Sequence, residues 1–245
     1  MEKVDVSKLI ALPFGRGRAG KCYVLHNGYL LKQYDILDEF TLRYEEEKIK
    51  KFVGRVNRTY IYPEDAYFLN GYLNQSKIKY IPEDTLFLKY PDVSITDLFD
   101  SVSDVYEDLL EISDDRILTM DLHDGNAILM NKKLYLIDRD EDVKDEFDSA
   151  FCLRENLYQL NSCIYEYILS DKYYVRKMTE ALIGKNRMLR LVTKELLNKS
   201  NKAFLLKDFL YEYQKVISRR YHSDLDNLGE IHSCLLSDKK RVRRR

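Results

Sequence analysis

The sequence predicts an α+β protein with two lobes, an antiparallel sheet with one helix followed by a helical lobe. The pairs Asn27-Gly28 and Asn70-Gly71 each separate two apolar runs, and Asn-Gly is the strongest short signal for a β-hairpin. After about residue 150, apolar residues recur at helical spacing. We therefore predict a sheet lobe over 1–90, a helical lobe over 91–238 and a basic tail over 239–245, with a short connector near 88–93.

In the sheet lobe, residues 7–35 predict three strands and residues 60–90 predict two or three more. Between them, residues 38–53 predict a helix, because Leu42, Ile49 and either Phe52 or Val53 form one apolar stripe and Gly54 can end it. The helical lobe begins with a predicted helix near 95–112 and a hairpin that turns at Asn131-Lys132. Further helices are predicted over 149–169, 173–184, 187–199 and 203–222. A ligand cleft is expected between the lobes.

The composition excludes several classes of protein. Forty basic residues balance 41 acidic ones, which argues against a surface that binds nucleic acid throughout. No apolar run approaches 18 residues and the N-terminal apolar stretch is short, so neither a membrane span nor a signal peptide is expected. The four cysteines have no C-x-x-C spacing, which is typical of reduced thiols in a cytoplasmic protein.

Gly15, Gly17 and Gly20 fit the pattern G-x-G-x-x-G. A dinucleotide-binding unit needs a helix after this pattern, whereas here a strand follows. A glycine loop between two antiparallel strands can instead fold over phosphates, because backbone N–H groups can approach closely where side chains are missing. The alternative is a flexible hairpin tip.

Lys32 lies in the next predicted strand, YLLKQY, which is rich in apolar residues. It is either an exposed strand lysine or a cation directed at phosphates beneath the glycine loop. In the predicted helix, Glu45 and Glu46 each share a stripe with Leu42 and Ile49. Either glutamate could therefore face inward and pair with Lys32.

Asp121 and Asn126 lie in the stretch DLHDGN, and Asp138 follows the predicted hairpin. A carboxylate and an amide oxygen on neighbouring strand ends suit Mg²⁺, a hard cation that prefers oxygen ligands. A second carboxylate nearby can orient a hydroxyl for attack on phosphorus. The alternative for Asp-Gly-Asn is an ordinary turn.

The order of these elements resembles the protein-kinase-like family, which has a glycine loop, a strand lysine, a helix glutamate, D-x-x-x-x-N and a metal-binding aspartate. The form D-L-H-x-G-N is closer to the antibiotic-phosphotransferase and bacterial kinase-like branches than to the usual eukaryotic form. The stretch NLYQLNSCIYE, 156–166, is similar to the helix at the floor of the kinase C-lobe. The resemblance covers roughly residues 9–169.

The resemblance implies a two-lobed protein-kinase-like fold and a phosphotransferase that uses ATP and Mg²⁺. Gly15, Gly17 and Gly20 would cover the phosphates, and Lys32 would grip them. Glu45 would hold Lys32, since Ile49 supplies the apolar residue that the family keeps four positions later. Asn126 and Asp138 would bind Mg²⁺, and Asp121 would orient the acceptor hydroxyl.

The chain departs from the family pattern in ways that bear on the substrate. Thr119-Met120 precedes Asp121, and Asp138-Arg139-Asp140 replaces D-F-G. The segment before Asn156 is too short for a full activation loop, and no long insert for a small molecule precedes Asp121. We therefore expect a protein Ser/Thr acceptor, with a small-molecule hydroxyl as the second choice.

Two further hypotheses use the same scaffold. One is a non-catalytic module that binds nucleotide or a partner, and the other is transfer of a nucleotidyl group. Retention of Lys32, Asp121, Asn126 and Asp138 together argues against a module that only binds, and no residue pattern favours nucleotidyl transfer. Nucleic acid is not an expected partner, except through the tail KKRVRRR.

Overall fold

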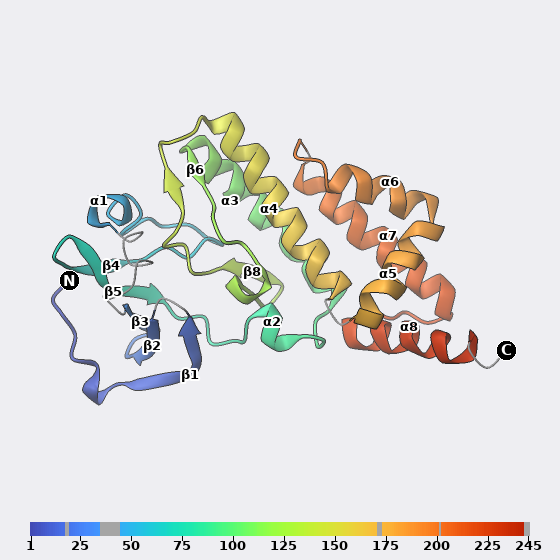
Figure 1. Ribbon diagram of the computed structural model, residues 1–245, viewed down its shortest axis with the longest axis horizontal. Helices are drawn as coiled ribbons and strands as arrows, with labels where there is room; N and C mark the ends of the chain where they lie inside the picture. Colours follow the sequence, from blue (N-terminus) through green and yellow to red (C-terminus); the bar gives the residue numbers. More distant parts are fainter. Residues whose placement is uncertain (18–19, 35–44, 171–172, 201, 243–245) are drawn as a thin grey trace.

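The computed structural model describes residues 1–245 except 18–19, 35–44, 171–172, 201 and 243–245. It confirms the α+β class, with the strands β1–β5 gathered at one end of the long axis and the helices α5–α8 at the other (Figure 1). No helix among the described residues is both long and apolar enough to cross a membrane.

Five antiparallel strands form the sheet, in the spatial order β1-β2-β3-β5-β4. After the short 3-10 helix Val6–Lys8, the strands are β1 (Ile10–Gly17), β2 (Gly20–Leu25), β3 (Tyr29–Tyr34), β4 (Asp65–Leu69) and β5 (Tyr72–Lys79). Both predicted Asn-Gly turns are confirmed. Asn27, Gly28, Asn70 and Gly71 all have positive φ, which asparagine and glycine tolerate best.

The predicted helix over 38–53 is shorter in its described part, because α1 spans only Glu46–Ile49. Residues 35–44 lie outside the described residues. Beyond Ile49 the chain tightens, since the Phe52 N–H donates to the Ile49 carbonyl, 2.9 Å away. Gly54, which was predicted to end the helix, lies five positions beyond its last residue, where its φ is +77° and its N–H donates to the Pro63 carbonyl.

A second group of elements joins the sheet to the helices. It comprises α2 (Leu86–Lys89), α3 (Ile95–Asp114), β6 (Ile117–Leu118), the 3-10 helix η3 (Asp124–Asn126), β7 (Ala127–Met130), β8 (Lys133–Leu136) and β9 (Val143–Lys144). The hairpin of β7 and β8 turns at Asn131-Lys132 as predicted, with positive φ at both residues. Ser94 caps α3 by accepting a hydrogen bond from the Asp97 N–H.

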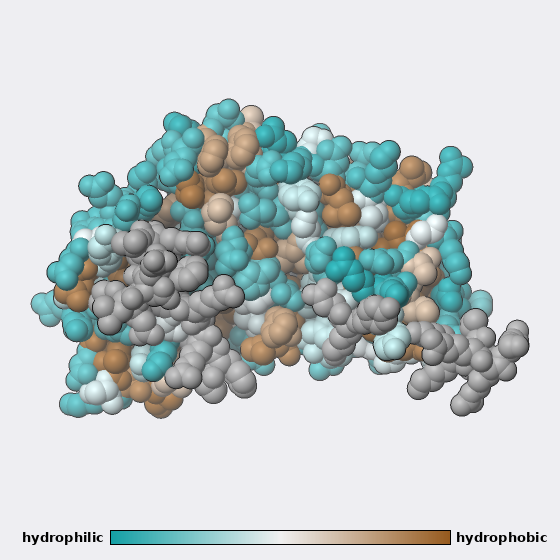
Figure 2. Space-filling model, in the orientation of Figure 1, coloured by the Kyte–Doolittle hydropathy of each residue, from teal (hydrophilic) through white to brown (hydrophobic). Residues whose placement is uncertain are grey.

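The remaining helices are α4 (Ser149–Leu169), α5 (Tyr173–Lys185), α6 (Arg187–Leu196), α7 (Ala203–Tyr221) and α8 (Leu228–Val242). Four of these match predicted helices. The fifth, α8, extends into the predicted tail, so residues 239–242 are helical and 243–245 lie outside the described residues. Hydrophilic residues cover much of the face in Figure 2, and apolar residues are scattered over it.

The largest buried cluster connects the two halves of the chain. Phe52, Tyr60 and Tyr62 belong to the same cluster as the apolar faces of α3, α4 and α7. The segment around Tyr60 also pairs with β8, because the Ile61 N–H donates to the Leu136 carbonyl and the Leu136 N–H donates to the Thr59 carbonyl. The β7–β8 hairpin that leads to Asp138 is therefore held on its outer edge by chain from the sheet half.

Candidate functional site

Lys32 is buried near the middle of the sheet. It lies on β3 opposite Cys22 of β2 and Ser76 of β5, and only 7% of the residue is exposed. Its ammonium pairs with Asp138 Oδ1 and with Asp140 Oδ2, the latter at 2.8 Å. The structure thus joins two residues that the sequence proposed for one site, Lys32 and Asp138, which are 106 positions apart.

Glu45 does not pair with Lys32, and this corrects the expectation. Its side chain is half exposed and lies 3.3 Å from Lys48 Nζ. A backbone bridge to Tyr72 fixes Glu45, the extended residue that precedes α1, beside the start of β5. Glu46 pairs with Lys50 instead. Both glutamates therefore pair with other lysines near the surface, and the Lys32 ammonium pairs with Asp138 and Asp140.

Asp140 and Tyr34 were missed by the sequence reasoning. The Tyr34 hydroxyl donates to Asp140 Oδ2 and lies 3.0 Å from Ser76 Oγ, and Tyr34 is 1% exposed. A signal was present, because residues two apart on a strand share a face. Lys32 and Tyr34 have that spacing on β3, so Tyr34 could have been found in this way. Asp138 and Asp140 lie beyond the end of β8, so strand spacing does not indicate Asp140.

These contacts shift the pKa values of the charged groups in the cluster. Burial alone would lower the pKa of Lys32, but the carboxylates of Asp140 and Asp138 outweigh it and hold that pKa well above its usual range. Burial would also raise the pKa of Asp138, yet the Lys32 charge and hydrogen bond bring it below its ordinary value. For Asp140, burial and the neighbouring Asp138 charge dominate and raise the pKa.

Asp121 and Asn126 lie together on the loop before β7. The Asn126 amide nitrogen donates to the Asp121 carbonyl at 2.9 Å and to its carboxylate Oδ2 at 3.3 Å. Asn126 is buried, whereas the Asp121 side chain is 57% exposed. His123 has a structural role, because its Nδ1 accepts a hydrogen bond from the Gly125 N–H at 3.0 Å. The loop therefore presents a carboxylate to solvent on a backbone fixed by hydrogen bonds.

Arg139 links this loop to the Asp138 segment. Its buried guanidinium donates to the carbonyls of Ile137 and Asp121, at 3.0 and 3.4 Å, and lies 3.4 Å from Asp142 Oδ1. The Ile137 N–H in turn donates to the Asn126 carbonyl at 2.9 Å. Lys32, Asp121, Asn126 and Asp138 are thus connected by a continuous set of contacts at one place in the fold.

The glycine loop is described only on its two strands. Gly15 and Gly17 lie in β1 and Gly20 begins β2, while the tip at 18–19 lies outside the described residues. Gly20 has a packing reason to be glycine, since a Cβ there would lie 1.9 Å from the Gln33 carbonyl oxygen. This contact places β2 directly against the strand that carries Lys32.

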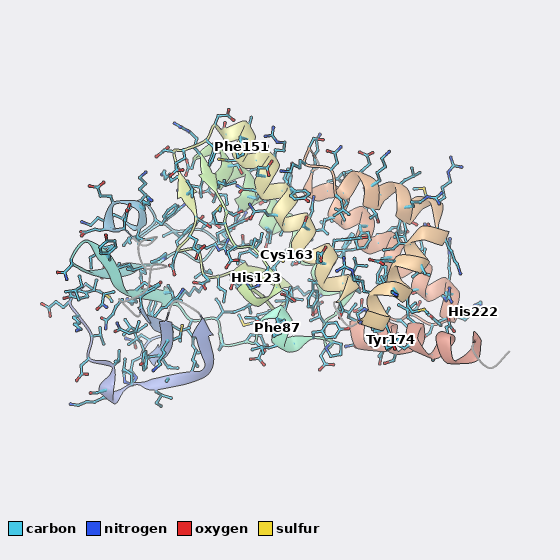
Figure 3. The ribbon with its side chains drawn as sticks, in the orientation of Figure 1. Phe87, His123, Phe151, Cys163, Tyr174 and His222 are labelled. Atoms are coloured by element: carbon cyan, nitrogen blue, oxygen red, sulfur yellow. The ribbon has the colours of Figure 1, made fainter. Side chains whose placement is uncertain are left out.

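A pocket of about 550 Å³ opens beside the loop of Asp121, between α2 and α4. Phe87, His123 and Cys163 lie near one another in Figure 3 and line this pocket, together with Tyr90, Leu122, Asp124, Ser162, Glu166, Tyr167 and Ser170. The lining contains two carboxylates and neither lysine nor arginine. An anionic ligand would therefore be disfavoured there.

The described residues contain no group of three or more His, Cys, Asp or Glu side chains that could bind a metal ion by themselves. A magnesium site here would have to rest on Asn126 and Asp138, as Mg²⁺ sites with one or two protein ligands and substrate phosphates do. Comparisons with protein families and with curated proteins found no match to this chain.

Proposed function

We propose that this protein is an ATP- and Mg²⁺-dependent phosphotransferase of the protein-kinase-like fold, acting on a hydroxyl group. The observation that supports it most is the pairing of buried Lys32, on the third strand of an antiparallel sheet, with Asp138 beyond the hairpin. In kinases a lysine on the third strand and an aspartate of the metal site meet the same nucleotide. The Asp121–Asn126 loop is attached to that aspartate segment through Ile137 and Arg139.

The residues present fit the two groups that this function needs. Lys32 offers a fixed cation for phosphate oxygens. The Asn126 amide nitrogen is engaged by Asp121, so the amide oxygen is the atom that Asn126 can offer to a cation, beside the carboxylate of Asp138. When bound, Mg²⁺ would neutralise phosphate charge during transfer.

Asp121 would orient the acceptor hydroxyl. Its carboxylate is exposed, lies on a backbone with φ of 51°, and is held by Asn126 at 3.3 Å, with His123 Nε2 3.7 Å away. A carboxylate positioned in this way can accept the proton of an attacking hydroxyl. Arg139 contacts only the carbonyl of Asp121, which leaves the carboxylate itself accessible.

Two observations bear on the identity of the acceptor, and each favours a different class. The absence of an insert before Asp121 favours a protein Ser/Thr hydroxyl, which remains our first choice. The pocket beside Leu122 and His123 favours a small-molecule hydroxyl as the second candidate, because about 550 Å³ is within the size range of small-ligand sites. Its carboxylates, Asp124 and Glu166, exclude a strongly anionic acceptor. The proposal places the protein in the cytoplasm, where ATP is available and thiols such as its four free cysteines stay reduced.

The test uses Asp121→Asn. Asparagine tolerates the left-handed backbone and can still accept the Asn126 hydrogen bond, so the fold and nucleotide binding should be retained. Turnover should fall by about 10²–10⁴, the usual worth of a positioned base. The assay is transfer from γ-labelled ATP with Mg²⁺ into lysate, with protein and small-molecule label separated. Parent-like turnover in Asp121→Asn would exclude the catalytic role, and nucleotide binding by a parent that transfers to no acceptor would favour a binding module.

A further inference from the structure

Lys32 has two carboxylate partners, and they differ in their surroundings. The Asp140 side chain is 4% exposed and the Asp138 side chain is 40% exposed. Asp140 also accepts a hydrogen bond from the hydroxyl of Tyr34, which itself lies 3.0 Å from Ser76 Oγ. One carboxylate is thus enclosed by protein, and the other is partly exposed to solvent.

We propose that Asp140 is the fixed partner that positions Lys32, and that Asp138 is an exchangeable partner that leaves Lys32 when a cation binds. Asp140 would then have the part that the resemblance assigned to Glu45. This inference rests on the proposed function for the role of Asp138, but the anchoring of Lys32 by Asp140 concerns the protein alone.

The ammonium of Lys32 lies in the protein interior. A charge in a dry interior must keep a counter-charge, because an unpaired one is strongly unfavourable. If Asp138 were the sole partner, turning its carboxylate toward Mg²⁺ would leave Lys32 unpaired. Asp140, 2.8 Å from Lys32 Nζ, removes that obstacle. Asp140 cannot leave as easily, since Tyr34 holds its Oδ2 from the same strand face as Lys32.

The backbone between the two aspartates is fixed. Arg139 is 1% exposed and donates to the carbonyls of Ile137 and Asp121. The contacts direct the Asp138 and Asp140 carboxylates to Lys32 Nζ, whereas the Arg139 side chain turns to Asp142 and the Asp121 carbonyl. The movement required of Asp138 is therefore a side-chain rotation at the exposed end of the cluster, with no rearrangement of the segment.

The first experiment measures the anchor without nucleotide or metal. Urea denaturation of Lys32→Met, Asp140→Asn and the double variant gives their coupling. Asp140→Asn alone should raise the unfolding equilibrium constant by about 10²–10³-fold, as loss of one partner of a buried ion pair does, and it should couple strongly to Lys32→Met. Asp138→Asn should raise that constant about tenfold or less, because its carboxylate is partly solvated. Glu45→Gln is the matched control and should show no coupling to Lys32→Met.

The second experiment measures ATP binding in EDTA and in Mg²⁺. Asp138→Asn should keep the affinity seen in EDTA and lose the gain from Mg²⁺, whereas Asp140→Asn should lose affinity in both buffers. If Asp140→Asn does not fold, Tyr34→Phe replaces it as the test variant, because it keeps the buried ring. Tyr34→Phe should weaken ATP binding in EDTA and retain the gain in affinity from Mg²⁺.

Stronger coupling of Lys32 to Asp138 or to Glu45 than to Asp140 would overturn the anchor. Loss of the Mg²⁺ gain in Asp140→Asn alone would overturn the division of roles. A parent that binds no ATP in either buffer would overturn the proposed function and the exchange at Asp138, while the stability cycle would still decide whether Asp140 anchors Lys32.

Discussion

Gly20→Ala should destabilise the protein, even though glycine there would ordinarily be explained by a close approach of phosphate. An alanine Cβ would lie 1.9 Å from the Gln33 oxygen and 2.8 Å from its carbonyl carbon. Both are backbone atoms of β3, so no side chain can rotate away, and the strand that carries Lys32 must shift. Overpacking of this kind costs about 1–3 kcal/mol, and a clash with the backbone of a neighbouring strand belongs near the upper end.

For a chain of this size, about 3 kcal/mol lowers the melting temperature by roughly 6–12 °C. Calorimetry and urea denaturation of the protein without nucleotide measure the loss. Two other glycines are matched controls, because a Cβ on either meets nothing within 4 Å. Gly28→Ala should cost about 1 kcal/mol, since its φ is +79°. Gly184→Ala, within α5, should stabilise by about 0.5–1 kcal/mol.

A Gly20→Ala protein that melts with the parent and loses only ATP affinity would refute the packing argument. It would show instead that Gly20 serves the phosphates. A loss of stability equal to that of Gly28→Ala would also refute it, because a general cost of glycine replacement would then be sufficient to explain the result.

Three further predictions concern the site and its supports. Burial raises the pKa of Asp142 to about 6, so between pH values of about 4 and 6 the folded protein keeps a proton that the unfolded chain has released. The free energy of unfolding of the parent, relative to that of Asp142→Asn, should therefore fall by up to about 3 kcal/mol as the pH rises through that window. Urea denaturation measures it, and a difference between the two proteins that does not change with pH would contradict this. Gly125→Ala would place a Cβ 2.7 Å from the His123 ring and should cost about 1 kcal/mol of stability. In urea denaturation, the double variant with His123→Ala should lose less stability than the sum of the two single variants. Cys22 lies opposite Lys32, so ATP should slow its alkylation severalfold relative to that of Cys234 on α8. Mass spectrometry follows both reactions, and equal protection of the two cysteines would count against nucleotide binding near β2.

The turns and helices could be predicted because their signals are local. Asn27-Gly28 carries its own preference for positive φ, and the apolar spacing of residues 149–169 is visible without knowing any partner. The pairing of Lys32 could not be predicted in the same way. Its partners lie 106 and 108 positions away, and helical periodicity around Glu45 carries no information about which of several carboxylates reaches a buried ammonium.

Arg139 shows the same limit. In the sequence it is one charge among the acidic residues of RDEDVKDEF, a stretch typical of a solvated loop. In the fold its side chain is fully buried against Asp142. Burial of a charge depends on the surrounding elements, here the loop of Asp121 and the hairpin before Ile137, so the sequence around Arg139 alone could not indicate it.

The segment around Tyr60 has a consequence for how the chain can be divided. Tyr60 and Tyr62 belong to the cluster that includes the helices, and Thr59 and Ile61 bond to Leu136. A gene fragment ending at residue 90 would encode a polypeptide whose large tyrosine rings have lost their packing partners. A fragment beginning at residue 91 would leave one edge of the β7–β8 hairpin bare. The halves should therefore be obtained in native form only when expressed together, and a protease cut near residue 90 should yield two pieces that stay associated.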